Sequence, residues 1–190
     1  ASIYAQVNLA ESLMKIKNQE QREIAQWLVS ATQQARKLQD LRAEAYALGQ
    51  LGHLYERLRQ WSDARKVTEQ ALKITQTIQA NDITVSWQWQ LGRVLKQQGQ
   101  TQDAGASLLP EAIAAYNQAV DTLSILRGDL VAMNPEVQFS FREQVEPIYR
   151  ELVQLLLQND PNQATLQRAR EVIEALQLAE LNNFFREACL

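Results

Sequence analysis

The sequence predicts an all-α protein in which pairs of helices stack on one another to form an elongated array. Residues that favour helices dominate the chain, whereas its 190 residues include only six Gly and four Pro. A hydrophobic content of 46% and a charged content of 22% are typical of a folded globular protein. Self-similarity at a fixed spacing of 40 residues then indicates a repeat of helix pairs.

The repeat appears when residues 48–64, LGQLGHLYERLRQWSDA, are aligned with residues 88–104, QWQLGRVLKQQGQTQDA. The alignment superimposes two short motifs: Leu51-Gly52 on Leu91-Gly92, and Asp63-Ala64 on Asp103-Ala104. Each copy should therefore contain two helices with one motif on each. After Asp103-Ala104, Glu111-Ala112 restarts the second motif eight positions later, which predicts an insertion that ends with Pro110 in the first turn of a helix.

The apolar positions fit this arrangement. Leu48, Leu51, Tyr55 and Leu58 form one stripe at helical spacing, and Trp87, Leu91, Val94 and Leu95 repeat it. Gly52 lies beside the first stripe, so we expect a neighbouring helix to approach closely there, with Ala64 and Ala71 supplying small surface. Residues 3–38 are expected to be a degenerate earlier pair with two stripes: Leu9, Leu13 and Ile16, then Ile24, Leu28, Ala31 and Ala35.

Two long helices should follow residue 127. Asn134-Pro135 and Asp160-Pro161 have the composition of helix starts. Pro147 should kink or split the first of these helices, and the last should run from about residue 162 to 188. We therefore divide the chain into repeats over residues 1–127 and a helical extension, packed on the array, over residues 128–190.

Leu51-Gly52-His53-Leu54-Tyr55, followed by Ala64 and Ala71, resembles the tetratricopeptide repeat, a helix pair with Leu-Gly-x-x-Tyr on its first helix and alanines on its second. The second copy departs from that pattern, because Leu95 replaces the tyrosine. The 40-residue spacing exceeds the usual 34, which predicts longer helices. The resemblance implies a right-handed solenoid of two to three repeats that binds a protein or peptide.

Residues 129–157 and 169–190 resemble the segment that joins tetratricopeptide repeats to the CHAT domain, a caspase-like peptidase domain, in cyanobacterial proteins. The most specific stretches are QFSFREQVEPIYREL (138–152) and AELNNFFREACL (179–190). The resemblance implies that a peptidase domain with a His/Cys dyad follows residue 190 in a longer protein. An excised piece is also expected because the first residue is Ala rather than Met. The peptidase motifs are absent from this chain, so we expect it not to be an enzyme.

Composition argues against several other classes of function. The formal charge is −3 and no Lys/Arg cluster gathers on one face, so no nucleic-acid partner is expected. The chain lacks both a membrane-spanning apolar run and a signal segment, which favours the cytoplasm. One Cys and one His cannot form an internal disulfide or a His/Cys metal site, and no cofactor is expected.

His53 and Cys189 are the one candidate pair of base and nucleophile. They lie on different predicted helices, and no glycine-rich loop offers an oxyanion hole. We therefore interpret Cys189 as a packing residue.

The expected binding surface is the concave groove, which the first helices of stacked units line in such arrays. Residues off the apolar stripe should face it: Gly49, His53, Glu56 and Arg57 in one copy, and Trp89, Arg93 and Lys96 in the next. Arg57, Arg93 and Lys96 could hold an acidic peptide or a C-terminal carboxylate. The alternative is that these residues simply form a solvated face.

The last helix is apolar around most of its circumference, through Leu178, Leu181, Phe184, Phe185 and, at its end, Cys189. A solvated helix should not be apolar on several sides, so we expect a covered surface. Two functions follow. The chain is a protein-interaction module, the regulatory or scaffolding arm of the larger protein, or it is a homo-oligomerisation module that dimerises through this helix.

Overall fold

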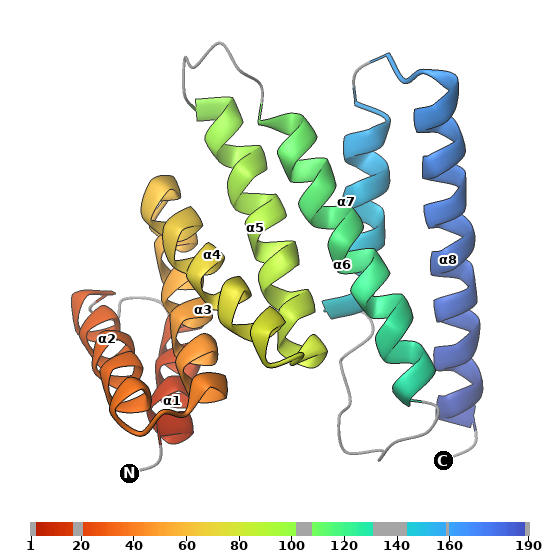
Figure 1. The fold of residues 1–190 in the computed structure, drawn as a ribbon. Coiled ribbons are helices and arrows are strands. Elements are labelled where there is room, and N and C mark those ends of the chain that lie inside the picture. Colours follow the sequence, from red (N-terminus) through yellow and green to blue (C-terminus); the bar gives the residue numbers. More distant parts are fainter. Residues whose placement is uncertain (1–2, 17–20, 102–107, 131–143, 159, 189–190) are drawn as a thin grey trace.

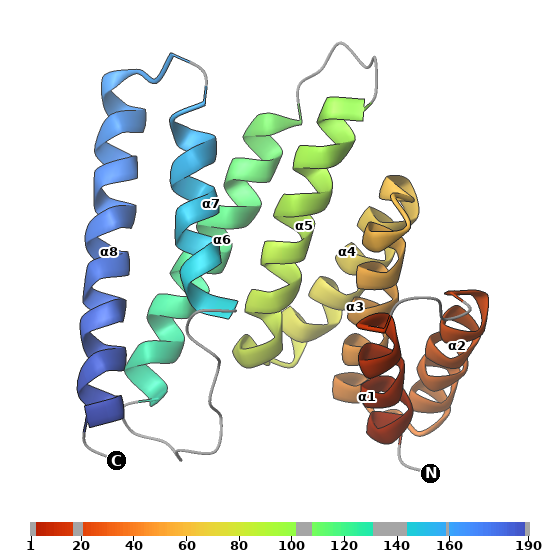
Figure 2. The same ribbon diagram turned by 180° about the vertical axis from the view of Figure 1, so that it is seen from behind.

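The computed structural model describes residues 3–16, 21–101, 108–130, 144–158 and 160–188; of residues 127–130 and 185–188 it describes only the helical backbone. These ranges contain eight helices: α1 (Ile3–Met14), α2 (Gln21–Lys37), α3 (Leu41–Arg57), α4 (Trp61–Thr77), α5 (Asn81–Thr101), α6 (Leu109–Leu130), α7 (Glu146–Leu156) and α8 (Gln163–Ala188). Each helix packs against the next one in the chain, and α1 and α8 lie at opposite ends of the array (Figures 1 and 2). The described part of the chain is therefore all-α, with helices packed in sequential pairs.

Three helices end in the same way. α2, α3 and α4 have 17 residues each, and a connection of three residues follows each of them. The second residue of each connection has a left-handed backbone: Gln39 at φ 55°, Arg59 at 58° and Gln79 at 53°. The next N–H then bonds a carbonyl in the last helical turn, as Gln60 N does with Tyr55 O at 2.9 Å. Each of these helices spans 20 residues together with its connection, so a pair of them spans the 40-residue period.

The predicted stripe on α2 is correct, because Ile24, Leu28, Ala31 and Ala35 are all buried. The stripe predicted on α1 is wrong for Leu9 and Ile16, which are each about half exposed, at 51% and 52%, whereas Leu13 is half-buried against the N-terminal core. The buried residues of α1 lie on another face, formed by Ile3, Val7, Ala10 and Met14. Both faces of this helix carry apolar residues at helical spacing, and contact with α2 and α3 selects the one that is buried.

The repeated glycines lie where helices touch. A Cβ on Gly52 would lie 2.5 Å from Thr68 Oγ1 and 2.6 Å from Gln90 Nε2, so the expected close approach is present. A Cβ on Gly92 would lie 2.6 Å from the Tyr116 ring. When α6 is aligned with α4 by the 40-residue period and the eight-residue offset, Tyr116 occupies the position of Thr68. The buried alanines agree with this register, because Ala112 and Ala119 correspond to Ala64 and Ala71.

The C-terminal helices share one apolar core with α6. This core includes Tyr116, Leu123, Ile148, Leu152, Val172 and Leu176. Pro110 lies in the first turn of α6, as expected, and α8 covers the range predicted for the last helix. Pro147 does not kink α7, because α7 begins at Glu146 and the proline lies in its first turn, where no N–H is needed. Asn134-Pro135 and most of the 103–111 insertion lie outside the described residues.

Candidate functional site

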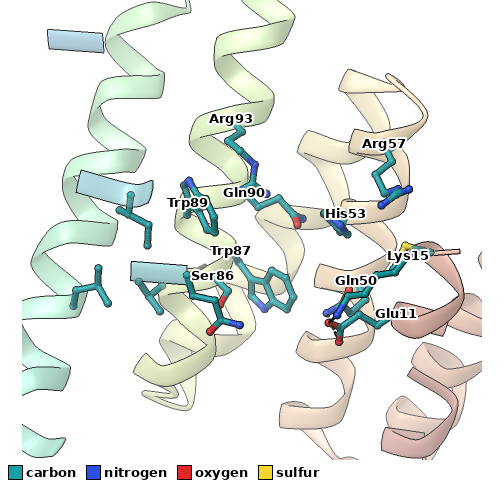
Figure 3. Close-up of a pocket in the computed structure, with 15 residues that line it drawn as sticks. Glu11, Lys15, Gln50, His53, Arg57, Ser86, Trp87, Trp89, Gln90 and Arg93 are labelled. Carbon is teal, nitrogen blue, oxygen red and sulfur yellow. Dashed lines mark hydrogen bonds and ion pairs between the residues drawn. The ribbon is translucent and has the colours of Figure 1, made fainter. Parts of the chain in front are cut away.

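The first helices of the four pairs, α1, α3, α5 and α7, converge on one pocket with a volume of about 200 Å³ (Figure 3). They or the residues next to their ends supply the whole lining except Leu123, which comes from α6. The pocket therefore lies on the surface that a helix-pair array uses as its groove.

Four of the seven residues predicted for the groove line this pocket, and Gly49, Glu56 and Lys96 do not. His53 and Arg57 reach it from α3, and Trp89 and Arg93 from α5 (Figure 3). Lys96 is half-buried on α5 but does not line the pocket. The prediction for Gly49 is wrong, because this residue is buried beneath the indole of Trp87. A Cβ on Gly49 would lie 2.1 Å from a carbon of that ring.

Arg93 is held by two neighbours. Its Nε donates to Glu56 Oε1 at 2.7 Å and its Nη2 donates to Glu56 Oε2 at 2.9 Å, so the ion pair is bidentate. The guanidinium carbon also lies 4.3 Å from the ring centroid of Trp89, a cation–π geometry. The charge of Arg93 is thus matched within the protein, which leaves Arg57 and Lys96 as the cations that an acidic peptide would meet.

The same pair explains the charge state of Glu56. Burial by itself would raise the pKa of Glu56, but hydrogen bonds from Arg93 and His53 outweigh it and lower this pKa to about 2. His53 Nδ1 lies 3.3 Å from Glu56 Oε2. Burial lowers the pKa of Arg93, whereas the hydrogen bond with Glu56 raises it, and the net pKa is above the ordinary value. Both members of the pair are therefore charged at neutral pH.

A second polar cluster joins the groove to the C-terminal helices. Trp89 Nε1 donates to Glu151 Oε2 of α7 at 3.0 Å, and the Tyr116 hydroxyl of α6 donates to the same oxygen. Burial and the negative charge of Glu151 raise the pKa of Tyr116. Glu151 and Tyr116 are residues that the sequence reasoning missed. The one available signal was the eight-residue offset, which places a tyrosine where the preceding copy has Thr68.

Two residues that line the pocket each have a buried polar atom without a hydrogen-bond partner among the described residues. These atoms are Nε1 of Trp87 and Oε1 of Gln50. Figure 3 shows Trp87 of α5 and Gln50 of α3 reaching toward the same space, with Glu11 beside Gln50. The amide of Gln50 is oriented because its Nε2 donates to Glu11 Oε2 at 3.4 Å. Both atoms are neutral and buried from solvent.

The surface predicted on the last helix is partly described. Leu178, Leu181 and Phe184 are exposed, at 53%, 51% and 63%. The side chain of Phe185 and the whole of Cys189 lie outside the described residues, and so does any relation between His53 and Cys189. No residue of α8 in the described chain lines the pocket around His53.

Within the described residues, no group of three His, Cys, Asp or Glu side chains is placed to hold a metal ion. A helix that is both long enough and apolar enough to cross a membrane is likewise absent from this part of the chain. Comparison of the sequence with protein-family profiles gives no match, and comparison with curated proteins gives none either.

Proposed function

We propose that this chain is a protein-recognition module of the tetratricopeptide type, whose concave groove binds a peptide segment of a partner. The convergence of α1, α3, α5 and α7 on one pocket carries this proposal, because solenoid arrays recognise peptides on the surface that their first helices line. The repeated Leu-Gly and Ala motifs support the assignment to tetratricopeptide repeats.

We extend the proposal to the place of the module in a larger protein. The resemblance of residues 129–157 and 169–190 to the segment that precedes CHAT domains supports a regulatory or scaffolding arm attached to a peptidase domain. The arm itself does no chemistry. Trp89 supplies a route for coupling, because it lines the pocket and also bonds Glu151 of α7. A bound peptide that moved Trp89 would therefore change the packing of α7 and α8.

The test selects peptides from a displayed random library with the chain and measures their affinity for two variants. Ser86→Phe places a large side chain in the pocket lining, whereas Ser62→Phe makes the same change at an exposed position on α4. We expect Ser86→Phe to weaken the selected peptides at least about tenfold, which corresponds to ~1.4 kcal/mol, and Ser62→Phe to leave their affinity unchanged. Equal affinity for both variants, with both folded by circular dichroism, would contradict binding in the groove.

A second function, homo-oligomerisation through α8, is favoured by one observation. Exposed apolar side chains recur along this helix at Leu166, Ile173, Leu178, Leu181 and Phe184. Multi-angle light scattering over a range of concentrations tests this candidate. If α8 pairs with its own copy, Leu181→Lys should give a monomer, whereas Leu9→Lys, at an equally exposed position on α1, should not. A wild-type chain that stays monomeric at all concentrations would exclude it.

A further inference from the structure

We infer that the pocket takes one bulky apolar side chain of an acidic peptide, and that the C-terminal helices complete the wall on which this side chain rests. The inference rests on the proposed function of the groove and specifies what the groove binds. It goes beyond recognition by a repeat array, because part of the wall comes from α7, which has no repeat motif.

One end of the pocket is apolar and continuous with the core of the C-terminal half. Val85 of α5, Leu123 of α6 and Ile148 of α7 belong to one cluster of buried residues in contact, and all three line the pocket. Trp89 packs against the same cluster and also lines the pocket. Shared contacts therefore hold these four residues together as one apolar wall.

The wall is fixed before any peptide binds. Trp89 Nε1 donates to Glu151 Oε2 of α7 at 3.0 Å, and the guanidinium carbon of Arg93 lies 4.3 Å from the centroid of the Trp89 ring. Ile148 is part of the core that α6, α7 and α8 share. Surface that is already ordered loses little freedom on binding, so contact with it contributes more to affinity.

The size of the pocket suits one large side chain. An apolar cavity of about 150 Å³ holds a benzene ring, and this pocket has a volume of about 200 Å³. Sites that enclose drug-sized molecules are larger, at ~300–1,000 Å³. A Leu, Ile, Met or Phe side chain therefore fits, and it gains free energy by removing its own surface and that of the wall from water.

A charged side chain suits the apolar end poorly. Val85, Leu123 and Ile148 cannot pair with an ion, and a charge buried without a partner is costly. The carboxylates behind this end are already engaged: Glu151 accepts from Trp89 and Tyr116, and Glu56 accepts twice from Arg93.

The end of the pocket formed by α1 and α3 has one unmatched charge. Glu11 is the one carboxylate in the described lining, and it pairs with Lys15 at 3.4 Å. Arg57 is the lining cation without a partner among the described residues, and it is exposed at the end of α3. Figure 3 shows Arg57 on α3 and Trp89 on α5 at opposite sides of the pocket. A carboxylate complements Arg57, so an acidic residue should flank the apolar one.

The experiment sequences the peptides that the full chain selects from a displayed random library. We expect most of them to have Leu, Ile, Met or Phe at one fixed position, with Asp or Glu enriched within a few residues of it. Changing the fixed residue to Ala in a selected peptide should weaken binding at least about tenfold. The inference is overturned if no apolar position is fixed, or if the change to Ala leaves the affinity unchanged.

Matched variants test the wall itself. Val85→Ala enlarges the apolar end and should raise the preference for Phe over Leu in the peptide at least about fivefold. Val94→Ala is the control, because Val94 lies on the same helix and is equally buried, at 0% against 2%, but does not line the pocket. Ile148→Val should shift the preference in the same direction, unlike Ile24→Val, since both isoleucines are 1% exposed and only Ile148 lines the pocket. Equal preferences within either pair overturn the inference.

The charge is tested in the same way. Arg57→Gln should abolish the enrichment of Asp and Glu, whereas Arg22→Gln, an equal change of charge at an exposed position on α2 outside the pocket lining, should leave it intact. Acidic residues that remain enriched with Arg57→Gln, or that disappear with both variants, overturn the assignment of an acidic peptide.

The two proposals fail in different ways. If Ser86→Phe weakens the selected peptides but these peptides have no fixed apolar position, the groove function stands and the inference of an apolar side chain is wrong. If Ser86→Phe leaves their affinity unchanged, the groove function is wrong, and the inference falls with it.

Discussion

The interface between the second and third helix pairs differs from the interface between the third pair and the C-terminal pair, although both use the same face of the repeat. In the first, Gln90 of α5 donates to the Gly49 carbonyl at 3.0 Å and to Thr68 Oγ1 at 2.8 Å, beside the Arg93–Glu56 ion pair. In the second, Tyr116 replaces the threonine, and its longer side chain reaches Glu151 on α7.

The comparison shows how a repeat can end in a different structure. The backbone geometry around Gly52 and Gly92 is shared, since both glycines admit a side chain from the second helix of their own pair. A larger residue at the repeated position then adds a hydrogen bond to α7, beside the bond from Trp89 and the apolar core that α7 and α8 share with α6. The change from Thr68 to Tyr116 at equivalent positions thus distinguishes the interface between two repeat copies from the site where α7 and α8 attach.

The largest effect is expected from breaking the interface between copies. Arg93→Met leaves Glu56 charged, largely buried and without its cation, and should lower the free energy of unfolding by about 3–5 kcal/mol. Urea unfolding followed by circular dichroism measures this loss. The double variant Arg93→Met/Glu56→Met should recover most of it, because it removes the unpaired charge. A double variant that is no more stable than the single one would show that the ion pair is not the cause.

Acid should weaken the same interface. The pKa of Glu56 is about 2 in the folded chain against an ordinary value of 4.5, so the unfolded chain binds the proton more tightly. The stabilisation is therefore complete above about pH 5 and is lost as pH falls from 4.5 toward 2, amounting to about 3 kcal/mol. Glu56→Gln should lack this part of the pH dependence when unfolding free energies are compared at pH 6, 4 and 3. Parallel curves for the two proteins would refute the assignment.

The two repeated glycines should differ in their tolerance of a methyl group. Gly92→Ala drives a Cβ into the Tyr116 ring, which is rigid and buried, and should cost about 2–3 kcal/mol. Gly52→Ala should cost about 1–2 kcal/mol, because its Cβ meets the hydroxyl of Thr68 and the amide end of Gln90, and these can turn away at the loss of the hydrogen bond between them. Thermal unfolding of the two variants measures the difference. The reverse order of stability would mean that Tyr116 is not fixed as the structure has it.

The attachment of the C-terminal pair can be weakened separately. Trp89→Phe keeps the ring face beneath Arg93 but removes the donor to Glu151, which should cost about 1–2 kcal/mol. Amide hydrogen exchange should become faster in α7 and remain unchanged in α2, at the far end of the array. A uniform increase in every helix would instead indicate global destabilisation and no special role for this bond.

The smallest effect, a gain, is expected at the helix ends. Arg59 has a left-handed backbone at φ 58°, a conformation that costs an L-residue about 1 kcal/mol but costs glycine little. Arg59→Gly should therefore raise the melting temperature by about 2–4 °C. Lys66→Gly also introduces a glycine, at an exposed position in the interior of α4, and should lower the melting temperature by a similar amount. A loss at both positions would count against this account of the connection.

The sequence predicted the helix pairs because their signals are local. The stripe of α2 and the small residues at 64 and 71 depend on spacing within one helix. The helix ends were harder to see, since Gln39, Arg59 and Gln79 stand where glycine is the usual signal. α1 was misread because two of its faces are apolar, and only the packed structure decides between them.

The candidate site was predictable as a surface but not as a network. The repeat identifies which positions of the first helices face the groove, so His53, Arg57, Trp89 and Arg93 could be chosen from the sequence. Their partners could not, because the Trp89–Glu151 bond joins residues 62 positions apart and no periodic signal relates them. For the same reason Arg93 was predicted to bind a ligand, whereas Glu56, 37 positions away, already holds it.

The matching helix ends at Gln39, Arg59 and Gln79 also determine which changes in chain length the protein can absorb. An insertion inside a helix rotates every later side chain by about 100° per residue and moves the buried stripe away from its neighbour. A whole pair of helices, 40 residues including both connections, brings the next helix to the same register against its neighbour. Gene duplication or deletion in units of 40 codons would therefore lengthen or shorten the groove while leaving the helices on either side in register.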